Sequence, residues 1–316
     1  MIINSHVHLN TNENYFFYNN YGFVRFLEEM CSNGISMSFP TLNPKLELFL
    51  CPNDCAFSCK KTNGSINRNL NSCICNFPNR HRVCIHEKNG KLAISCKTCG
   101  KLILESDIDP LRKYNLELIS ITKPYRDFIK PILYLSLCRA TLQKEIQFFE
   151  KNYNNDFVGF KFHPWNDQVN VSKLKVNTTK PILIHTGIRN LESATHAINF
   201  AKNNPKLKVV IAHAASLNLE ILKNISIMEN VFIDCCPSEF MFRNRFSCFT
   251  YPNDILSPED IYYKVLNIVP SNRILFGTDS PWGNSKQELE IVRNLKISSS
   301  IREQILWKNA TMLYLR

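Results

Sequence analysis

The residues best suited to chemistry in this 316-residue chain are polar side chains that stand at the ends of hydrophobic runs. His6 and His8 are separated by one residue in the first run, and in a strand such a pair points to one face. Later runs end in His163, His185, His213 and Asp279. Neutral imidazoles with a carboxylate are the donor set of a catalytic Zn²⁺, Mn²⁺ or Fe²⁺ ion that keeps a position open for water.

Taken alone, any one of these histidines is more often a core side chain that hydrogen-bonds to the backbone than a metal ligand. For His163 alone we prefer that interpretation, or a contact with substrate. The set as a whole is different, because burying so many polar groups together costs free energy unless a ligand satisfies them. The joint pattern therefore predicts a metal site.

The elements that position these residues alternate between β-rich and amphipathic runs. The expected strands are Ile2–Leu9, Ile35–Phe39, Ile132–Leu137, Val158–His163, Ile182–His185, Val209–His213, Val231–Asp234 and Ile274–Asp279. The expected helices are Tyr114–Tyr125, Leu142–Asn152, Asn190–Asn203, Leu217–Met228, Pro258–Val269 and Lys286–Leu295, with Ser257 as an N-cap. This order predicts an α/β fold, a (β/α)₈ TIM barrel. An open doubly wound sheet is the alternative, but no Gly-rich phosphate loop follows any strand.

Residues 45–112 interrupt the pattern between the second strand and its helix. Without them about 250 residues remain, the usual size of such a barrel. We therefore expect residues 1–44 and 113–316 to form the barrel and residues 45–112 to form a small inserted domain. Loops that follow the strands lie on the face where barrels keep their active sites, so the insert should lie there.

The insert is rich in cysteine, and we expect it to be a zinc-ribbon-like module with one or two structural Zn²⁺ ions. Its candidate ligands are Cys51, Cys55, Cys59, Cys73, Cys75, Cys84, Cys96 and Cys99. Cys96 and Cys99, followed by Gly100, are typical of a zinc knuckle. Cys84 with His86, or Cys73 with Cys75, could supply the opposing pair, and the sequence leaves this pairing open. An iron–sulfur site is a less favoured alternative for the first three cysteines.

The charge and the cysteine content limit the location and the partners. The net charge is +11, and residues 51–101 carry nine Lys or Arg against two acids. This basic segment favours a phosphate-bearing partner such as nucleic acid, although cations could equally balance zinc-bound thiolates. No run of 18 apolar residues predicts a transmembrane helix, and no signal peptide is indicated. Thirteen cysteines without an export signal favour thiols and metal in a cytoplasmic protein.

Several stretches, taken in order, resemble the amidohydrolase superfamily, and its amidohydrolase-2 branch in particular. They are His6-Val7-His8, GFKFHP, PILIHTG, VVIAH, LFGTDSPWG and ILWKNATMLY. The resemblance covers the chain except the insert. It implies a TIM-barrel, metal-dependent enzyme, mostly a hydrolase in this superfamily and sometimes a decarboxylase or hydratase. The chain departs from the usual opening at Asn4, where the family has an acid.

The resemblance also implies roles. His6, His8, His185 and Asp279 would bind one ion, and Asp279 would act as general base toward the attacking water. His213 would either bind a second ion or orient the water and polarise the scissile bond. Lys161 would either be carboxylated and bridge two ions or, uncarboxylated, attract an anionic substrate. The ion would be Zn²⁺, Mn²⁺ or Fe²⁺, and one or two would be present.

The loop after the seventh strand contains two further candidates. Arg243 and Arg245 are able to clamp a carboxylate or phosphate group of the substrate, although a solvated loop is the slightly preferred interpretation. Cys235 and Cys236 are more typical of small buried residues than of nucleophiles.

Three functions remain open. The first is a metal-dependent hydrolase that cleaves an amide, ester or lactone bond in a small, possibly anionic, molecule. The second is a TatD-like nuclease or phosphoesterase whose basic insert binds nucleic acid, although the glutamate typical of that group on a middle strand has no evident counterpart. The third is a non-enzymatic barrel that carries a zinc-binding module, which the intact histidines and Asp279 disfavour.

Overall fold

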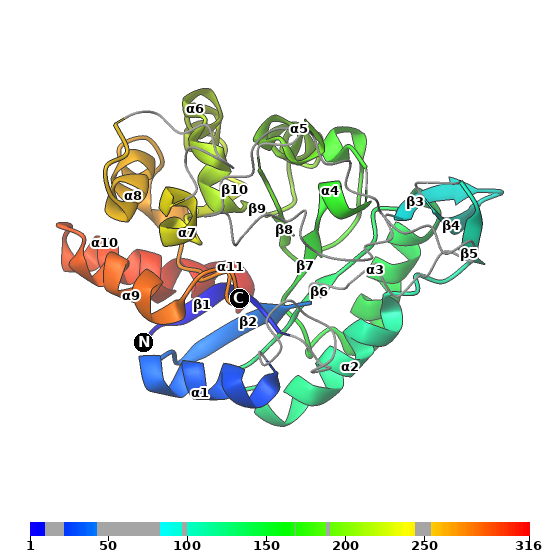
Figure 1. Cartoon of the computed structure of the whole chain (residues 1–316), viewed down its shortest axis with the longest axis horizontal. Coiled ribbons are helices and arrows are strands. Elements are labelled where there is room, and N and C mark those ends of the chain that lie inside the picture. Colours follow the sequence, from blue (N-terminus) through cyan, green and yellow to red (C-terminus); the bar gives the residue numbers. More distant parts are fainter. Residues whose placement is uncertain (10–21, 43–82, 97–99, 168, 188–189, 244–253) are drawn as a thin grey trace, which may run out of the picture.

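Eight parallel strands form one sheet whose spatial order follows the chain (Figure 1). The computed structural model describes residues 1–9, 22–42, 83–96, 100–167, 169–187, 190–243 and 254–316. The strands are β1 (Ile3–His8), β2 (Met37–Thr41), β6 (Ile132–Tyr134), β7 (Gly159–Phe162), β8 (Ile182–Ile184), β9 (Val209–Ile211), β10 (Val231–Asp234) and β11 (Ile274–Leu275). All eight lie within or next to runs that the sequence predicts as strands.

Backbone hydrogen bonds join the last strand segment to the first. The amide of Ser5 donates to the carbonyl of Phe276 (3.0 Å), and the amide of Thr278 donates to the carbonyl of His6 (2.9 Å). The amide of His8 donates to the carbonyl of Ser280 (2.8 Å). These bonds continue beyond the short β11 and nearly close the sheet into a barrel, as predicted.

Helices surround this barrel. They are α1 (Phe23–Asn33), α2 (Arg112–Thr122), α3 (Arg139–Tyr153), α4 (Pro164–Asp167), α5 (Ala194–Asn203), α6 (Leu219–Ile227), α7 (Ser238–Arg243), α8 (Pro258–Leu266), α9 (Ser285–Asn294), α10 (Ser299–Glu303) and α11 (Asn309–Tyr314). The predicted cap at Ser257 is confirmed, and it forms a reciprocal capping box with Asp260. Among the described residues, no helix combines the length and the apolar character that a membrane span requires.

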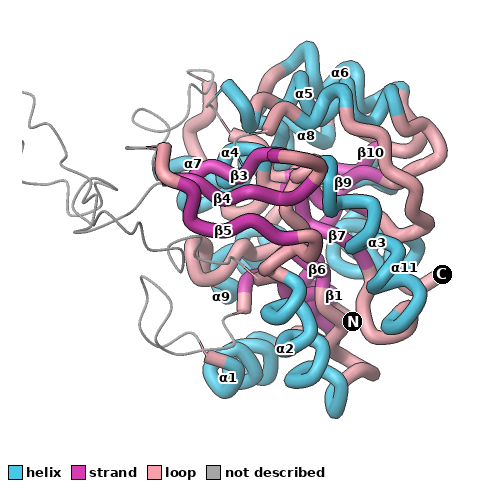
Figure 2. The backbone as a smooth tube through the Cα atoms, turned by 90° about the vertical axis from the view of Figure 1, so that its right-hand side faces the viewer, coloured by secondary structure: helices cyan, strands magenta, loops and turns pink. Residues whose placement is uncertain are grey.

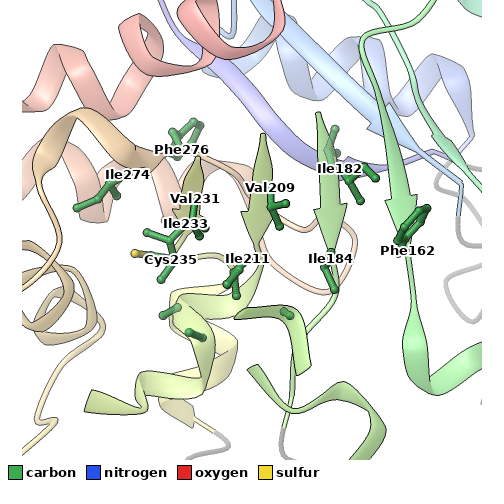
Figure 3. Packing of buried hydrophobic residues seen from close by; sticks show 14 of the residues in the cluster. Phe162, Ile182, Ile184, Val209, Ile211, Val231, Ile233, Cys235, Ile274 and Phe276 are labelled. Carbon is green, nitrogen blue, oxygen red and sulfur yellow. The ribbon is translucent and has the colours of Figure 1, made fainter. Parts of the chain in front are cut away.

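Side chains alternate between two apolar layers, as the period of two in a strand requires. Ile182 and Ile184 of β8 pack outward toward the helices together with the corresponding residues of the neighbouring strands (Figure 3). Leu183, between them, belongs to the separate cluster inside the barrel. Strands buried on both faces read as continuous hydrophobic runs, which explains why the sequence marks them clearly.

Helix α11 covers the end of the barrel at which the strands begin. Ala310, Leu313 and Tyr314 belong to the same buried cluster as Ile3 and Phe39. The rings of Tyr314 and Phe39 lie 5.0 Å apart between centroids. This end is therefore filled by apolar packing, and polar side chains gather at the opposite end.

A second, three-stranded antiparallel sheet lies within residues 45–112. It consists of β3 (Val83–Lys88), β4 (Lys91–Cys96) and β5 (Leu102–Ser106), and it lies beside α3 (Figure 2). Leu92 and Ile94 of β4 pack against Cys138, the residue just before α3. Asn89 and Gly90 join β3 to β4 with φ angles of 52° and 74°, the turn that suits a two-residue hairpin. The cysteine pattern predicts only a zinc module in this region, so the sheet is an addition to the prediction.

Most of the predicted zinc ligands lie outside the described residues, namely Cys51, Cys55, Cys59, Cys73, Cys75 and Cys99. Cys84 lies in β3 opposite Ser95, and Cys96 is buried at the end of β4. The amide of Gly100 donates to the carbonyl of Cys96 (2.8 Å), which brings the chain back toward β4 after Cys96. The structural zinc ions and the domain boundaries stay predictions.

Candidate active site

The polar residues at the strand ends converge at the mouth of the barrel, where the strands end. The Oδ1 atom of Asp279 lies 3.2 Å from Nε2 of His6 and 3.1 Å from Nε2 of His8. Asp279 follows β11, whereas both histidines lie on β1, so closure of the barrel brings these three residues together. Both imidazoles therefore face the same carboxylate, as the spacing of one residue predicts.

A second carboxylate fixes the protonation pattern of His6. Nδ1 of His6 lies 3.0 Å from Oδ2 of Asp234 at the end of β10. An ionised carboxylate only accepts hydrogen bonds, so Nδ1 carries the proton and Nε2 carries the lone pair. Nζ of Lys161 lies 2.8 Å from this Nε2 and donates to it. His6 thus presents a metal-binding lone pair toward Asp279 and Lys161.

Two hydrogen bonds, one from its backbone amide and one from its ring, hold His213 in place. Its amide donates to Oδ1 of Asp234 (3.0 Å), and its Nδ1–H donates to the carbonyl of Cys236 (2.6 Å). His213 opens a left-handed turn in which residues 213–217 all have φ angles between 50° and 59°. Such backbone costs about 1–2 kcal/mol per residue, and strain of this kind clusters at functional sites. Its donor atom lies within 4.8 Å of those of His6 and Asp279.

His185 contacts the other predicted ligands through His213. Nδ1 of His185 lies 2.9 Å from Nε2 of His213, and its Nε2 lies 3.4 Å from Oε2 of Glu192. The ring of His163 stacks on that of His185 with centroids 3.9 Å apart and an interplanar angle of 15°. The five predicted ligands thus form one connected set, in which His6 and His8 meet at Asp279 and His185 lies at the outer edge.

Burial controls the charges in this set. It lowers the pKa of His6 to about 4, with a further contribution from Lys161, and it lowers the pKa values of His8 and Lys161 as well. The pKa of His185 is well below its ordinary value, again mainly because of burial. These imidazoles are therefore neutral near pH 7, the form that binds metal.

The carboxylates of Asp279 and Asp234 keep their charge, unlike the buried imidazoles. Burial acts to raise the pKa of Asp279, but His6 and the hydrogen bond from His8 outweigh it and hold this pKa below its ordinary value. The pKa of Asp234 is also lowered, since the effect of burial is outweighed by His6 and by the hydrogen bond from that residue. Two ionised carboxylates among neutral imidazoles favour a cation at this point.

The geometry fits a divalent ion. Two donors that each lie about 2.1 Å from a tetrahedral Zn²⁺ ion are about 3.4 Å apart. The distances from Asp279 Oδ1 to the two histidine Nε2 atoms, 3.1 and 3.2 Å, are close to this value. His6, His213 and Asp279 offer donor atoms within 4.8 Å of one another and could therefore hold an ion, with His8 beside Asp279.

The remaining predicted residues have separate positions. Lys161 is fully buried beside His6, and His163 is partly exposed at the end of β7. Arg243 lies on α7 with 67% of its side chain exposed, and its Nε donates to Glu239. Arg245 lies outside the described residues. The substrate-binding role of both arginines stays a prediction.

The structure adds three residues that the sequence analysis does not assign to the site. Asp234 stands at the end of a predicted strand, as Asp279 does, so its position in the sequence could have indicated it as a site residue. Trp282 lies edge-on to His8 with ring centroids 4.9 Å apart. Glu192 ends the short 3-10 helix Asn190–Glu192, seven residues beyond His185, and no strand-end signal marks it.

Comparison with known proteins agrees with the superfamily resemblance. A family model described as amidohydrolase (Amidohydro_2) matches residues 177–316. This segment contains His185, His213 and Asp279 but neither histidine of β1. No curated protein sequence matches the chain.

Several solved structures share the fold. A dihydroxybenzoic acid decarboxylase from Polaromonas sp. JS666 with bound manganese and 2-nitroresorcinol is 14% identical, with a TM-score of 0.59 over 99% of this chain and 96% of that one. The 5-carboxyvanillate decarboxylase of Sphingomonas paucimobilis is 10% identical, with a TM-score of 0.60 over 99% and 98%. A probable 2-pyrone-4,6-dicarboxylic acid hydrolase from Acinetobacter baumannii, with bound citric acid, is 11% identical, with a TM-score of 0.55 over 100% and 99%. At these identities the likeness shows the fold.

Proposed function

We propose that this chain is a metal-dependent enzyme of the amidohydrolase type that hydrolyses an amide, ester or lactone bond in a small molecule. The observation that carries the proposal is the meeting of His6 and His8 with Asp279 at a single carboxylate oxygen, with distances of 3.2 and 3.1 Å. Residues from one end of the sequence and from near the other supply a donor set that suits Zn²⁺, Mn²⁺ or Fe²⁺. Manganese in one of the structural neighbours supports a divalent ion.

In this proposal His6, His8 and Asp279 hold the ion. When bound, such an ion polarises a carbonyl group and makes water a stronger acid. Asp279 is ionised and able to accept a proton, and His213 lies beside it to orient the water. His185 as a further ligand of this ion stays a prediction, because its Nδ1 faces His213.

Lys161 supports an anionic substrate group. Its amine is fully buried and lies 2.8 Å from His6, so it is near any group that contacts the ion. A carboxylated Lys161 that bridges two ions stays the alternative, and mass spectrometry of the intact protein under CO₂-rich and CO₂-free conditions distinguishes the two states.

Decarboxylation is the second candidate reaction, because two of the neighbours reported above are decarboxylases of aromatic acids. The ring of Trp282 beside His8 offers an aromatic surface that suits such a substrate. A panel of hydroxybenzoic acids, followed by CO₂ release, tests this reaction in parallel with lactones, esters and amides.

The nuclease hypothesis is less well supported. The positions of β7 and its end that face the barrel interior are Gly159, Lys161 and His163, and no acid occupies them, whereas a TatD-like enzyme places a glutamate on a middle strand. Most of the basic segment that would bind nucleic acid lies outside the described residues. Cleavage of DNA or RNA that Asp279→Asn abolishes would favour this alternative.

Metal analysis tests the proposed function directly. The purified full-length protein and the His6→Ala/His8→Ala variant are equilibrated with Zn²⁺, desalted and compared by elemental analysis. We expect the variant to lose one ion per chain while any zinc in the insert stays. Equal metal content in the two folded proteins would overturn the proposal.

A further inference from the structure

We propose that Cys236 is a positioning residue, whose thiol holds Asp234 and, through Asp234, orients His6 toward the ion of the proposed function. The inference rests on the proposed function, since it concerns the same ion. Cys236 is fully buried in the loop that follows β10, and it supplies no ligand of this ion. Its role would be to fix the residues that do.

Cys236 and its neighbour Cys235 have different surroundings, although both are fully buried. Cys235 belongs to the apolar cluster between the strands and the helices (Figure 3). The side chain of Cys236 contacts the site instead, because its Sγ atom lies 3.3 Å from Oδ1 of Asp234 and 3.5 Å from Nδ1 of His6. The chain therefore offers one thiol at the site and, next to it, a thiol among apolar side chains.

The thiol of Cys236 completes the hydrogen bonds of the Asp234 carboxylate. Oδ1 of Asp234 accepts from this thiol and from the amide of His213 (3.0 Å), and Oδ2 accepts from Nδ1–H of His6 (3.0 Å). A carboxylate that accepts from three donors is fixed in its orientation. Because such a partner orients a metal-binding imidazole, the thiol would act on the ion through Asp234.

The backbone of Cys236 holds a second imidazole of the site. Its carbonyl accepts from Nδ1–H of His213 at 2.6 Å. His6 lies on β1 and His213 directly follows the segment of β9, so Cys236 contacts side chains from two separate parts of the barrel. Only the side chain can be changed by substitution, and the test therefore concerns the thiol.

Gly277 confines this thiol. A Cβ atom at position 277 would lie 2.7 Å from Sγ of Cys236 and 2.8 Å from Cβ of His6. The backbone of Gly277 therefore packs closely against both side chains. This close approach holds the thiol against Asp234 and fixes its distance from His6.

The test measures the affinity of the full-length chain for Zn²⁺ by competition with a chromophoric chelator. The ion at the mouth is identified as the one that His6→Ala/His8→Ala lacks. We expect Cys236→Ala to bind it about tenfold more weakly, at the lower end of the range for the loss of such a partner, because a thiol is a weak donor. Cys235→Ala is the matched control and should bind the ion as wild type does.

Two further variants separate positioning from packing. Cys236→Ser keeps a donor, but its shorter C–O bond places the hydroxyl further from Asp234, so we expect an affinity between those of wild type and Cys236→Ala. In a chain that already carries Asp234→Asn, Cys236→Ala should change the affinity little, because both substitutions act by one route. Independent losses in that double variant, or equal losses in Cys235→Ala and Cys236→Ala, would overturn the inference.

Failure of the inference and failure of the proposed function give different results. If wild type binds no more Zn²⁺ than His6→Ala/His8→Ala does, both are wrong. If wild type binds the additional ion and Cys236→Ala binds it equally well, only the positioning role is wrong. Should circular dichroism show that Cys236→Ala does not fold, Cys236→Ser decides, and an affinity equal to that of wild type then overturns the inference.

Discussion

The two ends of the barrel use the same eight strands for different purposes. At the end that α11 covers, Phe39 and Tyr314 are packed in an apolar cluster. At the mouth, His6, Asp234 and Asp279 are buried and polar, and hydrogen bonds replace much of the apolar packing. The difference indicates that one end supplies stability and the other supplies chemistry, a division common in this architecture.

The backbone shows the same division. Apart from Asn89 in the β3–β4 turn, the described non-glycine residues with positive φ angles are Asp279 and residues 213–217, all beside the mouth. At the opposite end the described residues Ile3, Phe39 and Tyr314 have no such angles. Strain of this kind is held in place by the rest of the fold, so the mouth depends on stability supplied elsewhere.

Asp279→Asn should have the largest effect, and on function alone. The variant loses the ionised oxygen that both histidines of β1 face, so we expect activity to fall by about 1000-fold or more. Turnover of whichever substrate responds in the panels above measures the loss, and urea unfolding should show little change in stability. Full activity in the variant would contradict the assignment of the mouth as the catalytic end.

Phe39→Ala should have the next largest effect, and on stability. Its fully buried ring contacts Tyr314, so we expect a loss of about 3–5 kcal/mol in the free energy of unfolding. Urea denaturation measures it, with Phe128→Ala, at a position 39% exposed, as the control. The folded fraction should keep the wild-type metal content, and a loss of metal there would show that the two ends are not independent.

Glu288→Gln should change the pH dependence of stability. Burial raises the pKa of Glu288 to about 7, and this side chain accepts hydrogen bonds from Ser238 and Glu239 beside the mouth. Between the unfolded value near 4.5 and about 7 the folded chain keeps a proton that the unfolded chain releases, so stability falls as the pH rises.

The uncharged side chain of Glu288→Gln removes this loss of stability at higher pH. Relative to wild type, the variant should gain up to about 3 kcal/mol at pH 8 and nothing below pH 4. Urea unfolding at both pH values measures the gain, with Glu220→Gln as the exposed control. A difference that does not depend on pH would mean that the pKa of Glu288 is the same in the folded and the unfolded chain.

Asp234→Asn should have the smallest effect of the four. It removes the carboxylate that holds the proton on Nδ1 of His6, and substitutions of this kind weaken metal binding by about 10- to 100-fold. Competition with a chromophoric chelator measures the affinity, and Asp254→Asn, at an exposed residue paired with Lys264, is the control. Unchanged affinity in the variant would show that Asp234 does not orient His6 for metal.

The sequence predicts the barrel well because its strands are buried on both faces and read as hydrophobic runs. It predicts the end of the last strand less well, since Phe276–Ser280 bond to β1 without regular strand geometry throughout. The hairpin of β3 and β4 carries an Asn-Gly turn signal at Asn89 and Gly90, but the cysteine spacing predicts a zinc module there and no hairpin. Helix α1 is a further addition, outside the predicted alternation.

Within the site, the alternation rule brings His6 and His8 to one carboxylate, and strand ends bring His213 and Asp279 near them. Glu192 could not be found in this way, because its position depends on how a loop folds back past Gly187. The tautomers could not be found either, since they follow from the carbonyl of Cys236 and from Asp234, partners that only the folded chain provides.

Closure of the barrel between β1 and residues 276–280 has a consequence for biosynthesis. As the chain leaves the ribosome, His6 and His8 emerge more than 270 residues before their carboxylate partner, Asp279. Until then β1 lacks one neighbour, and no shortened product that ends before Asp279 can assemble the proposed donor set. Translation must therefore pass this residue before the protein can become active.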